Sequence, residues 1–301
     1  PLGCDEPSGL CHVPSNVAPQ TVGEGTGTVD VAPGGMGMTF DTDTGEITTG
    51  MSVIRPAGEG LDANTGIAFS STLQGTGEPA LGVFSMGSLT VQSGAVLHGV
   101  GKSALVLVVD GAVQIDGLVS VAAEGIQPGP GGFTGGQPGT VGNGPCPGQP
   151  GDGAAVGHYC TSGSGGAGYA GLGGPGGACN CVTPDDYAAG VGGPVCGTAE
   201  LIPLLGGSGG AGGSIAQGGP STPGGGGPGG GALQITAAGT LIISGTGQIN
   251  AGAEGGRQGT NGGGSGAGAG GAMLLEAPTV TVSVGAVLAA NGGGGGGGDC
   301  T

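Results

Sequence analysis

Three segments of this sequence repeat one pattern of short apolar strands separated by tight turns. Residues 104–125, 232–256 and 272–298 each begin with alanine and an apolar run, turn into a second strand, turn again and end near alanine and glycine or asparagine. Residues 80–103 hold a degenerate earlier copy. A repeat of this kind is typical of a β-solenoid, because one unit cannot bury its apolar face whereas stacked units can.

Stacking brings equivalent strands of successive coils side by side about 4.8 Å apart, so inward-pointing side chains form columns. We therefore predict an all-β fold, a right-handed parallel β-helix. A β-sandwich of short strands with glycine-rich loops is the alternative. The predicted columns are Leu105, Leu233 and Met273 on one face, Val113, Leu241 and Val280 on the second, and Val119, Ile249 and Val287 on the third.

Long glycine-rich insertions separate the coils at about 126–231 and 252–271, and a glycine-rich tail follows at 292–298. In both insertions glycine recurs at every third position, which matches the three-residue turn of a polyproline-II-type helix. Such helices pack closely through glycine and hydrogen-bond between chains, although a flexible loop is the alternative. The positions are Gly165, Gly168, Gly171, Gly174 and Gly177, then Gly256, Gly259, Gly262, Gly268 and Gly271, with Ser265 in the missing slot.

Glycine fills 85 of the 301 positions, and charged residues make up only 8%. The mean hydropathy is nevertheless +0.23. Disordered chains combine low hydrophobicity with high charge, so we expect an ordered protein built partly from glycine-rich backbone.

The glycine-rich part resembles the polyglycine-II bundles of small glycine-rich antifreeze proteins and of some phage adhesin tips. Residues 80–301 as a whole resemble glycine-rich secreted bacterial surface proteins with solenoid coils and glycine-rich insertions. The resemblance implies an extracellular structural or adhesive role and transfers no catalytic residues.

Residues 1–79 are predicted to form a separate N-terminal β-rich cap or connector. The stretch from Thr28 to Ala57 indicates short antiparallel strands joined by turns. Residues 80–301 then form the solenoid with its insertions and tail.

The charge balance indicates which partners the chain avoids. Three basic residues stand against 20 acidic ones, for a net charge of −17. Nucleic-acid binding needs clustered lysine and arginine, so we expect no nucleic-acid partner. We also expect no membrane insertion, because the apolar stretch 277–288 alternates with threonine and serine.

The eight cysteines predict up to four disulfides in an oxidising, extracellular or cell-surface location. Cys4 and Cys11 are close enough in sequence to pair locally, and the other pairings stay open. A zinc site that combines these thiols with His12 or His158 is the alternative. The cysteines are Cys4, Cys11, Cys146, Cys160, Cys179, Cys181, Cys196 and Cys300.

Three short motifs offer candidate chemistry. Asp41, Asp43 and Glu46 place carboxylates at a spacing that suits calcium, and a hairpin turn with solvated carboxylates is the alternative. Residues 101–103 (Gly-Lys-Ser) echo a phosphate loop, but a strand follows where a helix is required. Asp185 and Asp186 could serve acid–base chemistry, and the histidines, His98 among them, are isolated.

We therefore expect a non-enzymatic extracellular structural protein, a subunit that self-assembles into a fibre or surface layer. Solenoid ends expose unpaired backbone groups, which are templates for a further copy of the chain. The alternatives are a calcium-dependent adhesin for polysaccharide or ice, and a β-helical polysaccharide-cleaving enzyme. No cofactor is expected apart from the candidate calcium.

Overall fold

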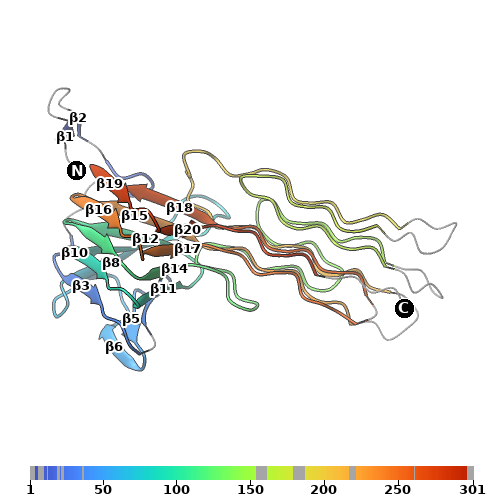
Figure 1. Ribbon diagram of the computed structural model, residues 1–301, viewed down its shortest axis with the longest axis horizontal. Helices are drawn as coiled ribbons and strands as arrows, with labels where there is room; N and C mark the ends of the chain where they lie inside the picture. The colour runs from blue at the N-terminus through green and yellow to red at the C-terminus, as the bar shows by residue number, and fades with distance from the viewer. Residues whose placement is uncertain are drawn as a thin grey trace.

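The protein consists of a β-helix and a long bundle of extended chain that projects from one corner of it (Figure 1). The computed structural model describes residues 4–5, 10–11, 13–18, 21, 24–35, 37–153, 161–178, 187–216, 222–260 and 262–296. Within these ranges the chain forms strands and no α-helix. No helical segment in them has the length and apolar character needed to cross a bilayer.

The first coil adds one strand to each of two sheets, and each later coil adds one strand to each of three sheets; these strands pair in parallel and in register from coil to coil. The chain is therefore a parallel β-helix, as the repeat predicts. The coils are β3 (Thr28–Val31) and β4 (Met38–Asp41); β9 (Leu81–Met86), β10 (Ser88–Val91) and β11 (Val96–Val100); β12 (Ala104–Val109), β13 (Val113–Ile115) and β14 (Leu118–Ser120); β15 (Ala232–Ala237), β16 (Thr240–Ile243) and β17 (Gln248–Asn250); and β18 (Ala272–Glu276), β19 (Thr279–Val282) and β20 (Val287–Ala289).

Two predicted columns are confirmed: Leu105, Leu233 and Met273 pair in succession, as do Val113, Leu241 and Val280. The third is wrong at its last position, because Ile249 pairs with Leu288. Val287 pairs with Gln248, and a slip of one residue moves a side chain to the other face of the sheet. Turns 244–247 and 283–286 are equal in length, so the offset between these coils is constant.

The N-terminal region contributes both a coil and a cap. The predicted antiparallel strands are present from β4 onward: β4 pairs antiparallel with β5 (Ile47–Thr49), and β5 pairs with β6 (Ser52–Arg55). In the sheet of β9, β7 (Gly60–Asp62) and β8 (Ile67–Thr72) add two more antiparallel strands. The prediction is wrong for β3, which pairs in parallel with β10, and β4 also pairs in parallel with β11 on its other side. A separate short hairpin joins β1 (Cys4–Asp5) to β2 (Leu10–Cys11).

The core is one continuous apolar cluster inside the coils. The column residues of the middle coils, such as Leu105 and Leu233, have no exposed surface. At the N-terminal end the phenylalanines fill the space under the hairpins: the ring of Phe84 lies 5.0 Å from Phe40 and 4.9 Å from Phe69. Few aromatic residues suffice because stacked aliphatic columns fill a narrow coil.

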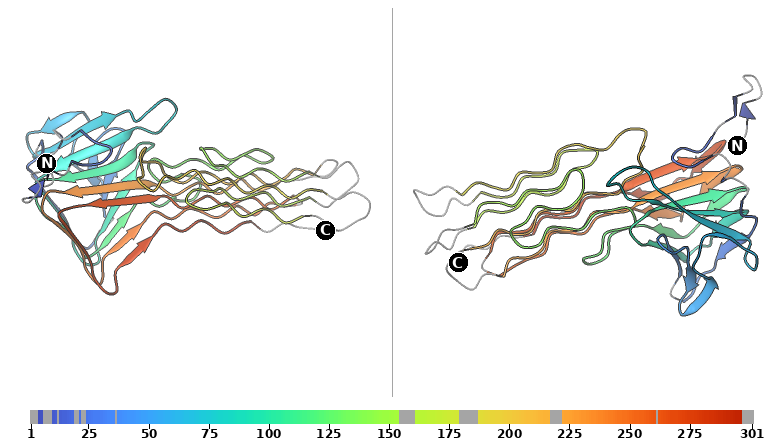
Figure 2. Two further views of the ribbon diagram at one scale, coloured as in Figure 1. Left: turned by 90° about the horizontal axis from the view of Figure 1, so that it is seen from above. Right: turned by 180° about the vertical axis from the view of Figure 1, so that it is seen from behind.

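Two insertions and the tail leave the same corner of the β-helix and run side by side as a bundle (Figure 2). The N–H groups of Gly207, Gly210 and Gly213 donate to the carbonyls of Gly230, Gly227 and Gly224 at 2.8 to 2.9 Å. Bonds from one run to the same neighbour thus recur at every third residue, as in a polyglycine-II array. The described parts of the glycine-rich insertions are therefore packed against one another by backbone hydrogen bonds.

Where the bundle leaves the β-helix, the hydrogen-bond repeat changes from two residues, as in a strand, to three residues, as in polyglycine II. Ala251 and Ala253 donate to Ala289 and Asn291, two residues apart as in a strand, and Gly256 then donates to Gly294, three residues further on. The in-register stack of the β-helix therefore continues into the bundle without a break in backbone pairing.

The run 204–214 passes through the centre of the bundle, and from Gly206 onward two glycines alternate with one small residue. Ser208, Ala211 and Ser214 are at most 1% exposed. Gly209 and Gly210 lie between Ser208 and Ala211, and a Cβ built on either glycine would overlap a neighbouring carbonyl oxygen. A run enclosed on every side has room for nothing larger.

The five glycines predicted at 165–177 do not form one ridge. The chain reverses near Tyr169, so that Gly166 donates to Gly174 and Gly163 to Gly177. Before the reversal, a Cβ built on Gly165 would overlap the carbonyl oxygen of Val191. After the reversal, a Cβ built on Gly174 or Gly177 would have no atom within 4 Å. In the second insertion the buried Ser265 donates a hydrogen bond from its hydroxyl to the Arg257 carbonyl, so the two stretches around these residues lie side by side.

A second apolar cluster covers the outer face of the sheet of β12 with the loop near Leu204 and with Val17. Tyr169 packs against this cluster, and its hydroxyl donates to the Leu205 carbonyl at 2.8 Å. Burial raises the pKa of Tyr169 to about 12.

We expect Tyr169 to make stability fall at high pH. Its pKa in the unfolded chain is about 10, so its stabilising effect is complete below pH 10 and is lost as the pH rises toward 12. The difference in melting temperature between the wild type and Tyr169→Phe should therefore shrink between pH 10 and 12. A difference that stays constant over this range would contradict the assignment.

Candidate assembly surface

The last coil leaves inward-facing apolar side chains open to solvent. Val282 in β19 is 50% exposed and Leu288 in β20 is 40% exposed, whereas their counterparts one coil earlier, Ile243 and Ile249, are fully buried. Within the described residues β18, β19 and β20 are the outermost strands of their sheets. Their outer backbone N–H and C=O groups therefore form an unpaired template as well.

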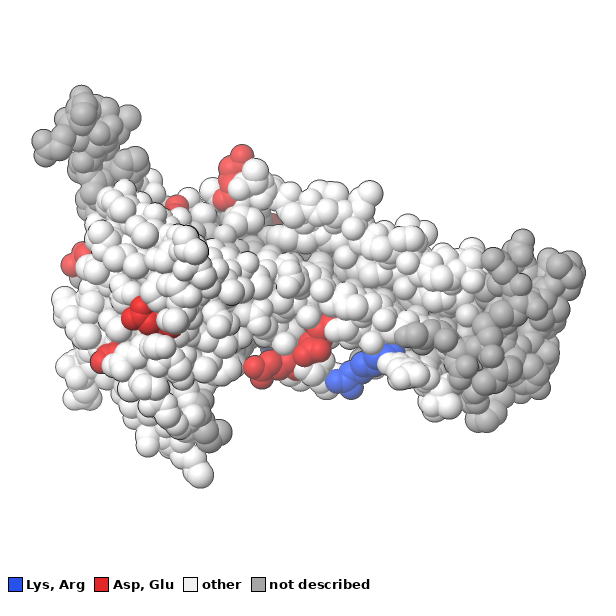
Figure 3. All heavy atoms as spheres, viewed as in Figure 1, with Lys and Arg blue, Asp and Glu red and all other residues white. Residues whose placement is uncertain are grey.

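This open coil carries almost no charge. From Gln258 to Gly298 the one charged residue is Glu276. Its carboxylate is held by Ser15, whose hydroxyl donates at 2.7 Å, and by the side chains of Gln234 and Thr236 at 2.9 Å. In Figure 3 the acidic side chains cluster in a few places, and most of the visible surface is uncharged.

The opposite end of the β-helix is different. The hairpins β5–β6 and β7–β8 cover two of its three sheets, and in the third β3 is the outermost strand. Arg55 fixes these hairpins from inside: it is 2% exposed, and its guanidinium donates to five backbone carbonyls. Burial lowers the pKa of Arg55, and Asp62 opposes that effect.

A groove of about 410 Å³ runs from the open coil onto the bundle. Met273, Tyr169 and Gly292 are among the residues that line it. A second hollow of about 320 Å³ continues it along 172–175 and 292–295. Glycine backbone forms much of its wall, and Gly294 and Gly295 have no neighbour where a Cβ would point. The open coil and this groove form one continuous face, here called the assembly surface.

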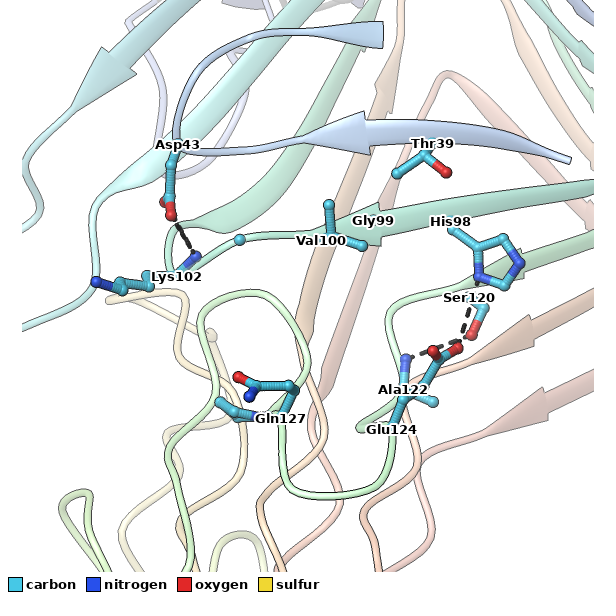
Figure 4. Close-up of a pocket in the computed structure, with 12 residues that line it drawn as sticks. Thr39, Asp43, His98, Gly99, Val100, Lys102, Ser120, Ala122, Glu124 and Gln127 are labelled. Carbon is cyan, nitrogen blue, oxygen red and sulfur yellow. Dashed lines mark hydrogen bonds and ion pairs between the residues drawn. The ribbon is translucent and has the colours of Figure 1, made fainter. Parts of the chain in front are cut away.

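A separate pocket of about 590 Å³ lies against β11 and β14 (Figure 4). Thr39, His98 and Ser120 are register partners on three adjacent strands and line one wall. Glu124 and Gln127 approach from the loop after β14, and Nδ1 of His98 lies 3.8 Å from Oε1 of Glu124. Asp43 and Lys102 stand at the other end.

The predicted calcium residues lie in the turn of the β4–β5 hairpin. Asp41 accepts bonds from the amides of Asp43 and Thr44 at 2.9 and 3.0 Å, and the Glu46 carbonyl accepts from the Asp41 amide. The Asp43 carboxylate binds the amides of Lys102 and Ser103. No group of three His, Cys, Asp or Glu side chains in the described ranges is placed to hold a metal ion, and calcium stays a prediction.

The Gly-Lys-Ser turn at 101–103 leads into strand β12, so the phosphate-loop match fails as expected. Its amides do bind an anionic group, but that group is the chain's own Asp43.

A disulfide joins Cys146 to Cys196 across the bundle, and the backbones of Cys4 and Cys11 are register partners in strands β1 and β2. The disulfide indicates an oxidising environment. Cys160, Cys179, Cys181 and Cys300 lie outside the described residues. So do His12 and His158, the proposed zinc ligands, and Asp185 and Asp186, the proposed acid–base pair.

The coils of the assembly surface were predicted from the sequence, whereas the N-terminal coil of β3 and β4 and the pocket were not. Hairpins and coil strands share the same apolar alternation, and the pocket residues come from segments that the coils bring together. Comparisons with protein-family models, curated proteins and solved structures found no match.

Proposed function

We propose that this chain is a non-enzymatic, extracellular structural protein that self-assembles through its assembly surface. The observation that carries the proposal is the open last coil, where core side chains such as Val280 and Val282 remain 40 to 50% exposed beside unpaired strands. Covering them with a second copy removes apolar surface from water and satisfies backbone groups in one step.

Charge supports a like partner at this face. Two molecules of net charge −17 repel each other over most of their surfaces. The assembly surface avoids this repulsion because its one carboxylate, Glu276, is already bonded within the chain. We therefore expect association to strengthen as salt screens the remaining charges.

The capped end favours pairing of open coil with open coil over simple head-to-tail addition. Hairpins block two of the three sheets at the N-terminal end. A pair of this kind uses the same patch on both copies and therefore closes as a dimer. Growth into a fibre then needs a second contact, elsewhere on the surface, between one dimer and the next. The resemblance to glycine-rich surface proteins and the disulfide support the extracellular setting.

A charged substitution in the open coil tests the proposal. Val282→Glu should abolish association by burying an unpaired carboxylate, while Val53→Glu, at a cap residue with 55% exposure, should leave it intact. Sedimentation velocity and negative-stain microscopy over a range of concentration and salt supply the readout. A wild type that stays monomeric throughout, or equal losses in both variants, contradicts the proposal.

A further inference from the structure

The pocket beside β11 is held by rigid parts of the fold on every side that contributes a polar group. Thr39, His98 and Ser120 sit on paired strands. The loop that carries Glu124 and Gln127 is pinned by two backbone bonds of 3.0 Å between these residues. Figure 4 shows the Gln127 side chain between the Asp43–Lys102 end and the His98–Glu124 end.

Several polar side chains in the pocket have hydrogen-bonding capacity to spare. The described residues supply no hydrogen-bond partner for the side chains of Thr39, Lys102 and Gln127. The His98–Glu124 pair is separated by 3.8 Å, beyond direct hydrogen-bond length. Together these groups offer hydroxyl, amide, imidazole, ammonium and carboxylate functions, which both donate and accept.

The charged side chains that remain available to a ligand are of opposite sign. The Asp43 carboxylate accepts two bonds from the Lys102 amide and two from Ser103, at 2.9 to 3.0 Å, so donors of the chain already occupy its oxygens. Lys102 and Glu124 then stand as one positive and one negative charge at opposite ends. An anion and a cation therefore each meet a charge of their own sign in this pocket.

The remaining wall is aliphatic, formed by Val100, Ala122 and Pro128. A neutral ligand that fits such a site has an apolar face of C–H groups and a rim of hydroxyls that both donate and accept. The volume of about 590 Å³ suits a ligand of one or two rings.

We propose that this pocket binds a neutral saccharide unit, with its C–H face on Val100 and Pro128 and its hydroxyls bonded to Gln127, Glu124 and His98. This site shares no lining residue with the assembly surface: it lies against the interior strands β11 and β14, whereas β20 of the open coil is the outermost strand of the same sheet. It would connect the protein to a glycan without calcium and without catalysis.

The test is titration of the isotope-labelled protein, followed by NMR amide and side-chain shifts, with methyl glycosides of glucose, galactose, mannose and N-acetylglucosamine. Glucuronate and glucosamine serve as charged comparators. We expect saturable shifts at Gln127, His98 and Lys102 with at least one neutral glycoside, with a Kd on the order of millimolar. Gln127→Ala should weaken binding about tenfold or more.

Gln248→Ala is the matched control, because Gln248 is an exposed glutamine on the same sheet and does not line the pocket. It should bind as the wild type does. The proposal is overturned if no neutral glycoside gives saturable shifts, if both glutamine variants bind equally, or if a charged comparator binds more tightly than every neutral sugar.

Discussion

Gly207→Ala is expected to break the packing of the glycine-rich bundle while leaving the β-helix folded. A Cβ on Gly207 would overlap the carbonyl oxygen of Ala269, and the Gly207 amide donates to Gly230. The obstacle is backbone, which cannot rotate away as a side chain can. The runs must separate, and hydrogen bonds on both sides lengthen, so we expect a loss of more than about 4 kcal/mol in local stability.

Hydrogen exchange is the appropriate measurement, because a bundle joined to a solenoid need not unfold in one step. Amides of the runs 204–214, 224–230 and 263–271 should exchange much faster in Gly207→Ala, and those of β12 should not. The control is Gly177→Ala, where a Cβ meets nothing within 4 Å. It should be neutral or stabilise slightly, by about 0.4–1 kcal/mol. Equal protection in both variants would mean that the runs are not packed as described.

The repeat predicted the coils because a buried column needs an apolar residue at the same place in every turn. Leu105, Leu233 and Met273 satisfy that need and lie in register. The β-helix could therefore be predicted from residues alone, and the equal turns 244–247 and 283–286 carry the offset of Leu241 and Val280 on to Ile249 and Leu288.

The N-terminal coil escaped prediction for a different reason. Residues 28–41 are separated from their stacking partners β10 and β11 by the hairpins β5–β8, so no short repeat marks them. Likewise, glycine periodicity predicts the helix type of a run but not where the run reverses. The reversal at Tyr169 divides one apparent ridge into an inward and an outward half.

The pocket could not be predicted because its residues share no motif. Asp43 and Lys102 stood out in sequence through calcium-like and phosphate-like spacings. The fold pairs the carboxylate of the first with the backbone amide of the second. Their nearness is set by the stacking of the first two coils, which is a tertiary property.

The same tertiary stacking makes Arg55 the residue on which the cap depends. Its guanidinium has five N–H donors, and each bonds a carbonyl at 2.6 to 3.2 Å. The side chain also lies 5.7 Å from the ring centre of Phe69. The five acceptors are the carbonyls of Gly45, Pro56, Gly58, Gly60 and Ile67.

Arg55→Met should destabilise the cap by about 3 to 5 kcal/mol, because methionine fills similar space and leaves five carbonyls without donors. Exchange of the β5, β6 and β8 amides should accelerate. Loosening of the hairpins should also expose Phe69 and Phe84, which are buried in the wild type, and so promote aggregation. Arg55→Lys should recover only part of the loss, since an ammonium cannot reach five divergent acceptors.

The matched control is Arg257→Met, which removes an equal charge from an exposed site on the bundle. If the two methionine variants melt together and exchange alike, net charge explains the effect and the carbonyl cage does not. If Arg55→Met alone loosens the hairpins, the cap over two of the three sheets is held by a buried cation. Among the described residues no such cap covers β18, β19 and β20, and this difference between the two ends is what the proposed assembly depends on.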